Sequence, residues 1–125
     1  MRYIGIDYGT QKIGLALSDE EGSFAFPHAV IKSDGTAVKV IADICRDERV
    51  GGMVIGRSLN YERKENALMK NVFSFAERLT EEIHLPIFYE DEVLTTREAS
   101  RVMAKDSLTD ARAAALILES FLNHK

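Results

Sequence analysis

Residues 3–19 read YIGIDYGTQKIGLALSD, and this stretch decides the fold. An apolar run ends on Asp7, a glycine follows at Gly9, and a second alternating run begins at Lys12. The pattern predicts a strand, a tight turn and an antiparallel return strand. A carboxylate at the end of a buried strand costs desolvation unless a cation or hydrogen-bond donors accompany it. Asp7 is therefore either a turn residue that accepts backbone N–H bonds or a ligand of a metal or phosphate–metal complex.

Strands and helices follow one another along the rest of the chain. Gly22-Ser23 marks the second turn, and Gly51-Gly52 is expected to end the first helix. A meander followed by βαβ units predicts one α/β domain over 1–125, with a mixed sheet and helices packed on its faces. Strands are expected over 2–7, 12–18, 23–31, 53–56 and 85–89, and helices over 36–48, 61–83, 95–104 and 108–123.

Composition indicates an ordinary globular protein, with 46% apolar and 29% charged residues. No apolar run approaches the roughly 20 residues that span a bilayer, and a strand pattern begins at once, so we expect neither membrane segment nor signal peptide. Cys45 is the single cysteine, which suits a reducing cytoplasm, and the three histidines lack zinc-site spacing. Because the net charge is −4, any basic surface for nucleic acid must be local.

Acidic residues stand where parallel strands of such a sheet should end. Ligands of open α/β sheets bind at the carboxyl ends of parallel strands, and Asp7 lies at that end of the first. Glu90, Asp91 and Glu92 follow the fifth strand. In a continuing strand Glu90 and Glu92 share a face that Asp91 opposes, so either face offers an acid near Asp7. The alternative is a solvated acidic turn.

Asp110 is the third candidate acid. It opens the last helix, and apolar residues follow it at helical spacing, so it lies on or beside the stripe that faces the sheet. Residues 107–110 also resemble a capping pattern, and an acid in the first turn complements the helix dipole without any active site.

Three carboxylates that converge in one cleft repel one another unless cations lie between them. Hard oxygen ligands favour Mg²⁺ or Mn²⁺. Two such ions about 4 Å apart can activate a water and stabilise the leaving oxygen in phosphodiester hydrolysis. The acids therefore indicate a metal-dependent phosphodiester hydrolase.

Four blocks of the chain resemble the motifs of a known family and cover nearly its whole length. They are residues 4–10 with Lys12, 13–16 and 18–19; residues 54–56 with 59–60; residues 91–92 with 94–96 and Ala99; and Asp110 with 113–114 and 117–118. In these blocks the chain is similar to the YqgF family of RNase H-like proteins, also called RuvX. Members are described as pre-16S rRNA nucleases, and formerly as Holliday junction resolvases.

The resemblance implies an RNase H-like α/β fold, a five-stranded mixed sheet in the order 3-2-1-4-5 with helices on both faces. Matched residue by residue, the catalytic and metal-binding acids are Asp7, Glu92 and Asp110, which selects Glu92 from the acidic run. Gly9 and Thr10 would let a phosphate or metal approach the backbone. The substrate-binding residues would be Gly9, Thr10, Lys12, Arg57, Asn60, Thr95 and Thr96, although the last two could equally cap the following helix.

The chain also departs from the family pattern. Val93 stands where an arginine is usual, Arg57-Ser58 replaces an apolar-proline pair, and a glycine is missing from residues 61–64. The basic stretch before the last helix is shortened to residues 97–109. These changes remove positive charge and loop length from the substrate side, which Arg57 is a candidate to replace in part. We therefore expect weak nucleic-acid binding in isolation, by a monomer or weak homodimer.

Several functions compete at this point. The first is a nuclease acting on structured RNA, namely the 5′ end of pre-16S rRNA, and the second is a resolvase of branched DNA. A third is a nuclease-like domain with weakened catalysis that serves as a binding or assembly factor. An ATP-binding fold of the actin and sugar-kinase type shares the first motif, but it needs two lobes and a longer chain.

Overall fold

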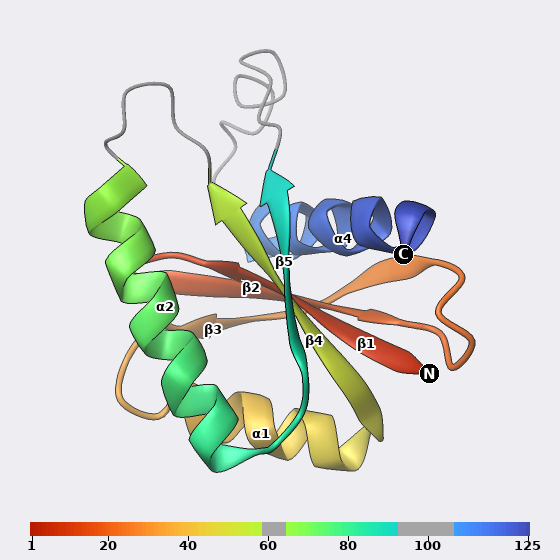
Figure 1. Cartoon of the computed structure of the whole chain (residues 1–125), viewed down its shortest axis with the longest axis horizontal. Helices are drawn as coiled ribbons and strands as arrows, with labels where there is room; N and C mark the ends of the chain where they lie inside the picture. Colours follow the sequence, from red (N-terminus) through yellow and green to blue (C-terminus); the bar gives the residue numbers. More distant parts are fainter. Residues whose placement is uncertain (59–64, 93–106) are drawn as a thin grey trace.

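The computed structural model describes residues 1–58, 65–92 and 107–125, without the side chains of 58, 65–69, 92 and 107–109 (Figure 1). The expected helix over 95–104 lies outside the described residues. In chain order the elements are β1 (Arg2–Tyr8), β2 (Lys12–Ser18), β3 (Ala25–Lys32), α1 (Ala37–Asp47), β4 (Val50–Ser58), α2 (Glu65–Glu82), β5 (Ile87–Glu92) and α4 (Ser107–His124).

The five strands form one sheet in the order β3-β2-β1-β4-β5, as the family resemblance implies. β2 pairs antiparallel with both β1 and β3, whereas β4 pairs parallel with both β1 and β5. β1, β4 and β5 therefore end at the same edge of the sheet, which is where ligands bind in open α/β sheets.

β1 is buried on both faces because the sheet lies between two layers of helices. Successive side chains of the strand point to opposite layers. Ile4 and Ile6 are fully buried in the larger core, beneath α1 and α2. Gly5 points the opposite way: a Cβ built on it would lie 2.8 Å from the Cβ of Leu118 in α4. The absent side chain thus lets α4 pack closely on the sheet, on the face opposite α1 and α2 (Figure 1).

α1 contributes the predicted apolar stripe to the larger core. Ile41, Ala42 and Cys45 are buried, as the helical spacing predicts. Burial raises the pKa of the Cys45 thiol to about 12, so the thiolate needed for redox or metal chemistry is strongly disfavoured there. The single cysteine is therefore a core residue.

The prediction that Gly51-Gly52 ends the first helix is wrong. The helix ends at Asp47, Arg49 takes the left-handed conformation with a φ of 57°, and both glycines lie inside β4. A Cβ on Gly51 would lie 2.6 Å from the Met1 side chain. The glycines therefore make room for the N-terminal strand instead of stopping the helix.

Candidate active site

Asp7 is half-buried and precedes the last residue of β1. It pairs with Gly14 across the antiparallel β1–β2 ladder. Because side chains alternate along a strand, Asp7 faces the same side as Gly5, which contacts α4. The first candidate acid therefore lies at the carboxyl end of β1, on the face that α4 covers.

Asp110 lies in the first turn of α4 and is half-buried. A Cβ on Gly14 would overlap the backbone carbonyl of Asp110, so no larger residue fits there without moving the helix. Since Gly14 is the cross-strand partner of Asp7, the same glycine places the start of α4 directly beside Asp7. The backbones of two acids that are far apart in the sequence are thus brought close together.

Glu92 is the last residue of β5. The register places Ile6, Ile55 and Tyr89 side by side on β1, β4 and β5. Asp7 lies one residue beyond Ile6, whereas Glu92 lies three residues beyond Tyr89. The backbone of Glu92 is therefore one intervening strand away from Asp7 and two residues, or about 7 Å, further along.

Glu90 is held by α4. Its side chain is only 9% exposed, and the hydroxyl of Ser120 donates a 2.6 Å hydrogen bond to its Oε2. Nε2 of His124 lies 2.9 Å from the same oxygen, and this contact raises the pKa of His124 through the hydrogen bond and the carboxylate charge. These partners explain how Glu90 can be buried at the level of Asp7 without a metal ion.

Asp91 faces the opposite side of the sheet, as strand alternation predicts. Its Oδ1 accepts hydrogen bonds from Nε of Arg57 at 2.8 Å and lies 2.7 Å from Nη2 of the same guanidinium. Arg57 is thus paired within the protein, and contact with a substrate phosphate would require this ion pair to open. Both side chains are about two-fifths exposed, so the pair is accessible to solvent.

The β1–β2 turn carries three of the expected substrate-binding residues. Thr10 and Lys12 are exposed next to the end of β1, where Asp7 lies. A Cβ on Gly9 would lie 2.6 Å from the carbonyl oxygen of Lys12, so the turn itself requires this glycine. The remaining expected residues, Asn60, Thr95 and Thr96, lie outside the described residues.

Carboxylates at this edge fit a hard divalent ion. No group of three or more metal-ligating side chains was found among the described residues, whose side chains do not include that of Glu92. The adjacent pair Asp7 and Asp110 supplies oxygen donors, the ligand type that hard divalent cations prefer. The third acid would come from the end of β5.

Ser120 and His124 are contacts of the acidic run that the sequence analysis missed. They lie four residues apart on α4, and this spacing places two polar groups on one helix face. That signal indicates a shared partner but does not identify Glu90, which lies on another element.

No described helix is long and apolar enough to cross a membrane.

The sheet order and solved structures define an RNase H-like fold. RuvC from T. thermophilus, solved with a Holliday junction substrate, superposes with a TM-score of 0.64 at 15% identity, over 98% of this chain and 93% of that one. The fowlpox virus Holliday junction resolvase has a TM-score of 0.59 at 12% identity over the full length of both chains. At these identities the likeness shows the fold alone.

Sequence comparison shows the family. Residues 1–124 match the model of the RuvX family, described as Holliday junction resolvase, and the chain belongs to this family. A relative from Nitratidesulfovibrio vulgaris, named "Putative pre-16S rRNA nuclease", is 34% identical over 98% of this chain and 94% of its own. Relatives of the same name from Syntrophus aciditrophicus and Rickettsia rickettsii are each 35% identical, over 98% and 96% of this chain and 89% and 84% of theirs.

Proposed function

We propose that residues 1–125 form a single nuclease domain that hydrolyses phosphodiester bonds with the acids Asp7, Glu92 and Asp110. The observation that supports this proposal is the contact between Gly14 and the backbone of Asp110, because Gly14 is the cross-strand partner of Asp7. A helix cap alone needs no such contact with a strand end. The family match over residues 1–124 supports the same assignment.

In this proposal the acids serve as ligands and positioning groups. Nucleases of this family and fold are generally dependent on divalent metals, and we propose Mg²⁺ or Mn²⁺ because the ligands are carboxylates. When bound, such ions polarise the attacking water and stabilise the leaving oxygen of the phosphodiester. Asp7 and Asp110 would hold the metal from β1 and α4, and Glu92 would hold it from the end of β5.

The β1–β2 turn is proposed to receive the substrate backbone. Thr10 can donate a hydrogen bond to a phosphate oxygen, and Lys12 can offset its charge. Both residues are exposed beside Asp7. Arg57 would join them only after leaving Asp91, so we propose for it a contact made on substrate binding.

We propose structured RNA as the substrate, and specifically the 5′ end of pre-16S rRNA. The name shared by three relatives at 34–35% identity, pre-16S rRNA nuclease, supports this choice. The family description favours a four-way DNA junction as the alternative. The two substrates share the phosphodiester chemistry, so the acids do not distinguish them.

A cleavage assay separates these substrates. Purified protein is incubated with Mg²⁺ or Mn²⁺ and with a 5′-extended 16S rRNA fragment, duplex DNA or a four-way junction, beside Asp7→Asn. We expect cleavage of the RNA that needs metal and is lost in Asp7→Asn. Preferred, symmetric cleavage of the four-way junction would instead assign the protein as a resolvase of branched DNA. Cleavage that survives Asp7→Asn would exclude the proposed site.

A further inference from the structure

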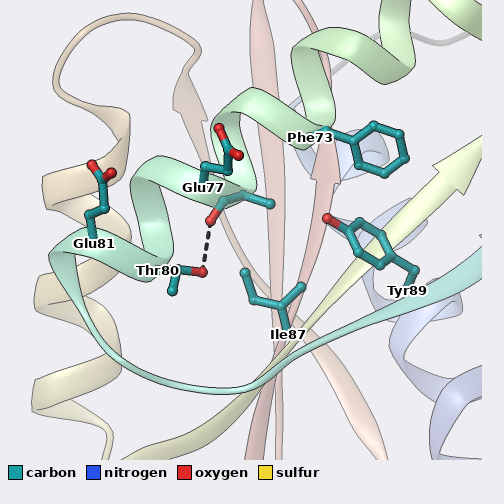
Figure 2. Close-up of a pocket in the computed structure, with 7 residues that line it drawn as sticks. Phe73, Glu77, Thr80, Glu81, Ile87 and Tyr89 are labelled. Atoms are coloured by element: carbon teal, nitrogen blue, oxygen red, sulfur yellow. Dashed lines mark hydrogen bonds between the residues drawn. The ribbon is translucent and has the colours of Figure 1, made fainter.

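A groove lies between α2 and β5, on the face of the sheet away from Asp7 and Asp110. It encloses a volume of about 530 Å³ and is lined by Phe73, Glu77 and Glu81 from α2 and by Ile87 and Tyr89 from β5, among others. Figure 2 shows the ring of Phe73 beside that of Tyr89 and Ile87 pointing from β5 towards Thr80 of α2, while Glu77 and Glu81 extend from α2. The nuclease proposal uses none of them.

β5 is an edge strand, so a second extended segment can pair with it beside the groove. It is the last strand of the sheet and, in the part of the chain that the structure describes, it pairs only with β4. Its outer edge therefore presents N–H and C=O groups that another extended segment can pair with. Proteins commonly bind extended peptides by adding a strand at such an edge.

Two aromatic rings form an exposed apolar anchor beside this edge. Phe73 is 46% exposed and Tyr89 is 37% exposed. Their ring centroids lie 5.6 Å apart in an edge-to-face arrangement. Exposed aromatic pairs of this kind offer large, rigid contact areas and are frequent energetic centres of protein interfaces.

The charge of the groove selects the occupant. Glu77 and Glu81 are exposed carboxylates along its α2 side. One nearby positive group, the guanidinium of Arg57, is already paired with Asp91, and a second, exposed Lys70, lies one helical turn before Phe73 on α2. Burial raises the pKa of Tyr89, whereas the charge of Arg57 lowers it and the smaller effect of Glu77 raises it. A nucleic-acid backbone would be repelled here, whereas lysine or arginine side chains would be attracted.

We propose that the groove binds an extended segment of a partner protein in which every second residue faces α2, and these residues are apolar at one end of the segment and lysine or arginine at the other. The segment pairs with the outer edge of β5, its apolar side chains cover Phe73 and Tyr89, and its basic side chains lie against Glu77 and Glu81. Because β5 ends at Glu92, such a partner would be held close to the proposed nuclease site while leaving that site open.

The test begins with a phage-displayed library of random peptides about nine residues long, close to the length of natural strands. Selection on the wild-type protein should enrich sequences in which every second residue is apolar towards one end and basic towards the other. The enriched peptide should bind at least about tenfold more weakly to Tyr89→Ser and to the double variant Glu77→Gln, Glu81→Gln. Glu119→Gln, an exposed acid on α4, is the matched control and should bind normally.

Two further readouts keep the result unambiguous. The amide NMR signals of residues 87–90 should shift when the peptide binds, and urea unfolding should show that each variant is folded. Enrichment of no common sequence, or a peptide that binds all variants equally, would overturn the proposal. So would a homodimer of the free protein that Tyr89→Ser disrupts, or RNA binding that this variant weakens, because the occupant would then be a second copy or a nucleic acid.

Discussion

Gly14 is the residue on which the geometry of the candidate site depends most visibly. A methyl group there would overlap the carbonyl of Asp110, and flexible side chains are not available to absorb the overlap because the contact is with backbone. We predict that Gly14→Ala destabilises the fold by about 1–3 kcal/mol, as overpacking commonly does, and lowers metal-dependent cleavage. Urea unfolding and the cleavage assay measure both effects.

Gly35→Ala is the matched control for this substitution. Nothing lies within 4 Å of a Cβ built on Gly35, so the same chemical change should leave stability and activity nearly unaffected. If Gly14→Ala were as stable and active as Gly35→Ala, the start of α4 would not be held against β2 in the way described.

Asp7 is predicted to lower the stability of the metal-free protein. It lies beside Asp110, and clustered carboxylates repel one another when no cation separates them. Asp7→Asn should therefore keep or raise the melting temperature in metal-free buffer while cleavage is lost. Asp47→Asn, an exposed acid of α1, should change neither. A clearly lower melting temperature for Asp7→Asn would indicate a structural role.

The sequence predicted individual site residues unevenly. Asp7 and Asp110 could be placed on a strand end and a helix start, because local patterns define both elements, and the structure places them there. The choice of Glu92 came from the family resemblance, since spacing alone did not separate it from Glu90. The partners of Glu90 could not be predicted, because Ser120 and His124 are brought to it by the packing of α4 across the sheet.

At the scale of elements, α4 contacts the sheet through polar groups near both of its ends. Its first turn lies on Gly14, and its last turn is tied to β5 through His124 and Glu90. The hydrogen bond and the charge of Glu90 raise the pKa of His124 above its ordinary value of 6.5. The stabilising contribution of His124 is thus fully present below pH 6.5 and is lost as the pH rises through the raised folded-state pKa.

We therefore predict that His124→Gln lowers the free energy of unfolding more at about pH 5.5 than at about pH 9. Urea unfolding at both pH values measures the difference. Ser120→Ala removes a hydrogen bond to the same carboxylate without removing a titrating group, so its cost should be similar at both pH values. Equal effects of His124→Gln at the two pH values would mean that the ion pair contributes nothing to stability.

Element types were predicted better than element ends. Helical spacing, alternation, short apolar runs and turn residues together predicted every strand and helix that the structure describes, because these are local properties of the chain. The glycines of β4 were misassigned because their role depends on Met1 and on Tyr3, whose ring lies 3.0 Å from a Cβ built on Gly52. A local pattern cannot show such a long-range contact.

For the whole molecule, charge governs the interaction with nucleic acid. The net charge is −4, and Arg57, one of the expected basic contacts, is already paired. We predict weak binding of labelled RNA and junction DNA at physiological salt, with a shallow dependence on salt concentration because few phosphates are neutralised. Titrations at two salt concentrations measure this, and nanomolar binding with a steep dependence would contradict it.

Lys12→Ala tests which part of the surface provides the remaining affinity. If the β1–β2 turn receives the substrate backbone, this variant should weaken RNA binding and flatten its salt dependence further. Lys39→Ala, an exposed residue of α1, should leave RNA binding unchanged. Equal binding by both variants would place the substrate elsewhere on the molecule.

We propose that the strand ends and the start of α4 together hold a divalent metal. Titration of Mn²⁺ into metal-free protein, followed by electron paramagnetic resonance, measures this binding without requiring a substrate. We predict that the wild-type protein and Asp47→Asn bind one or two Mn²⁺ ions per chain, and that Asp7→Asn binds them at least about tenfold more weakly. Equal Mn²⁺ binding by wild type and Asp7→Asn would contradict the proposed site.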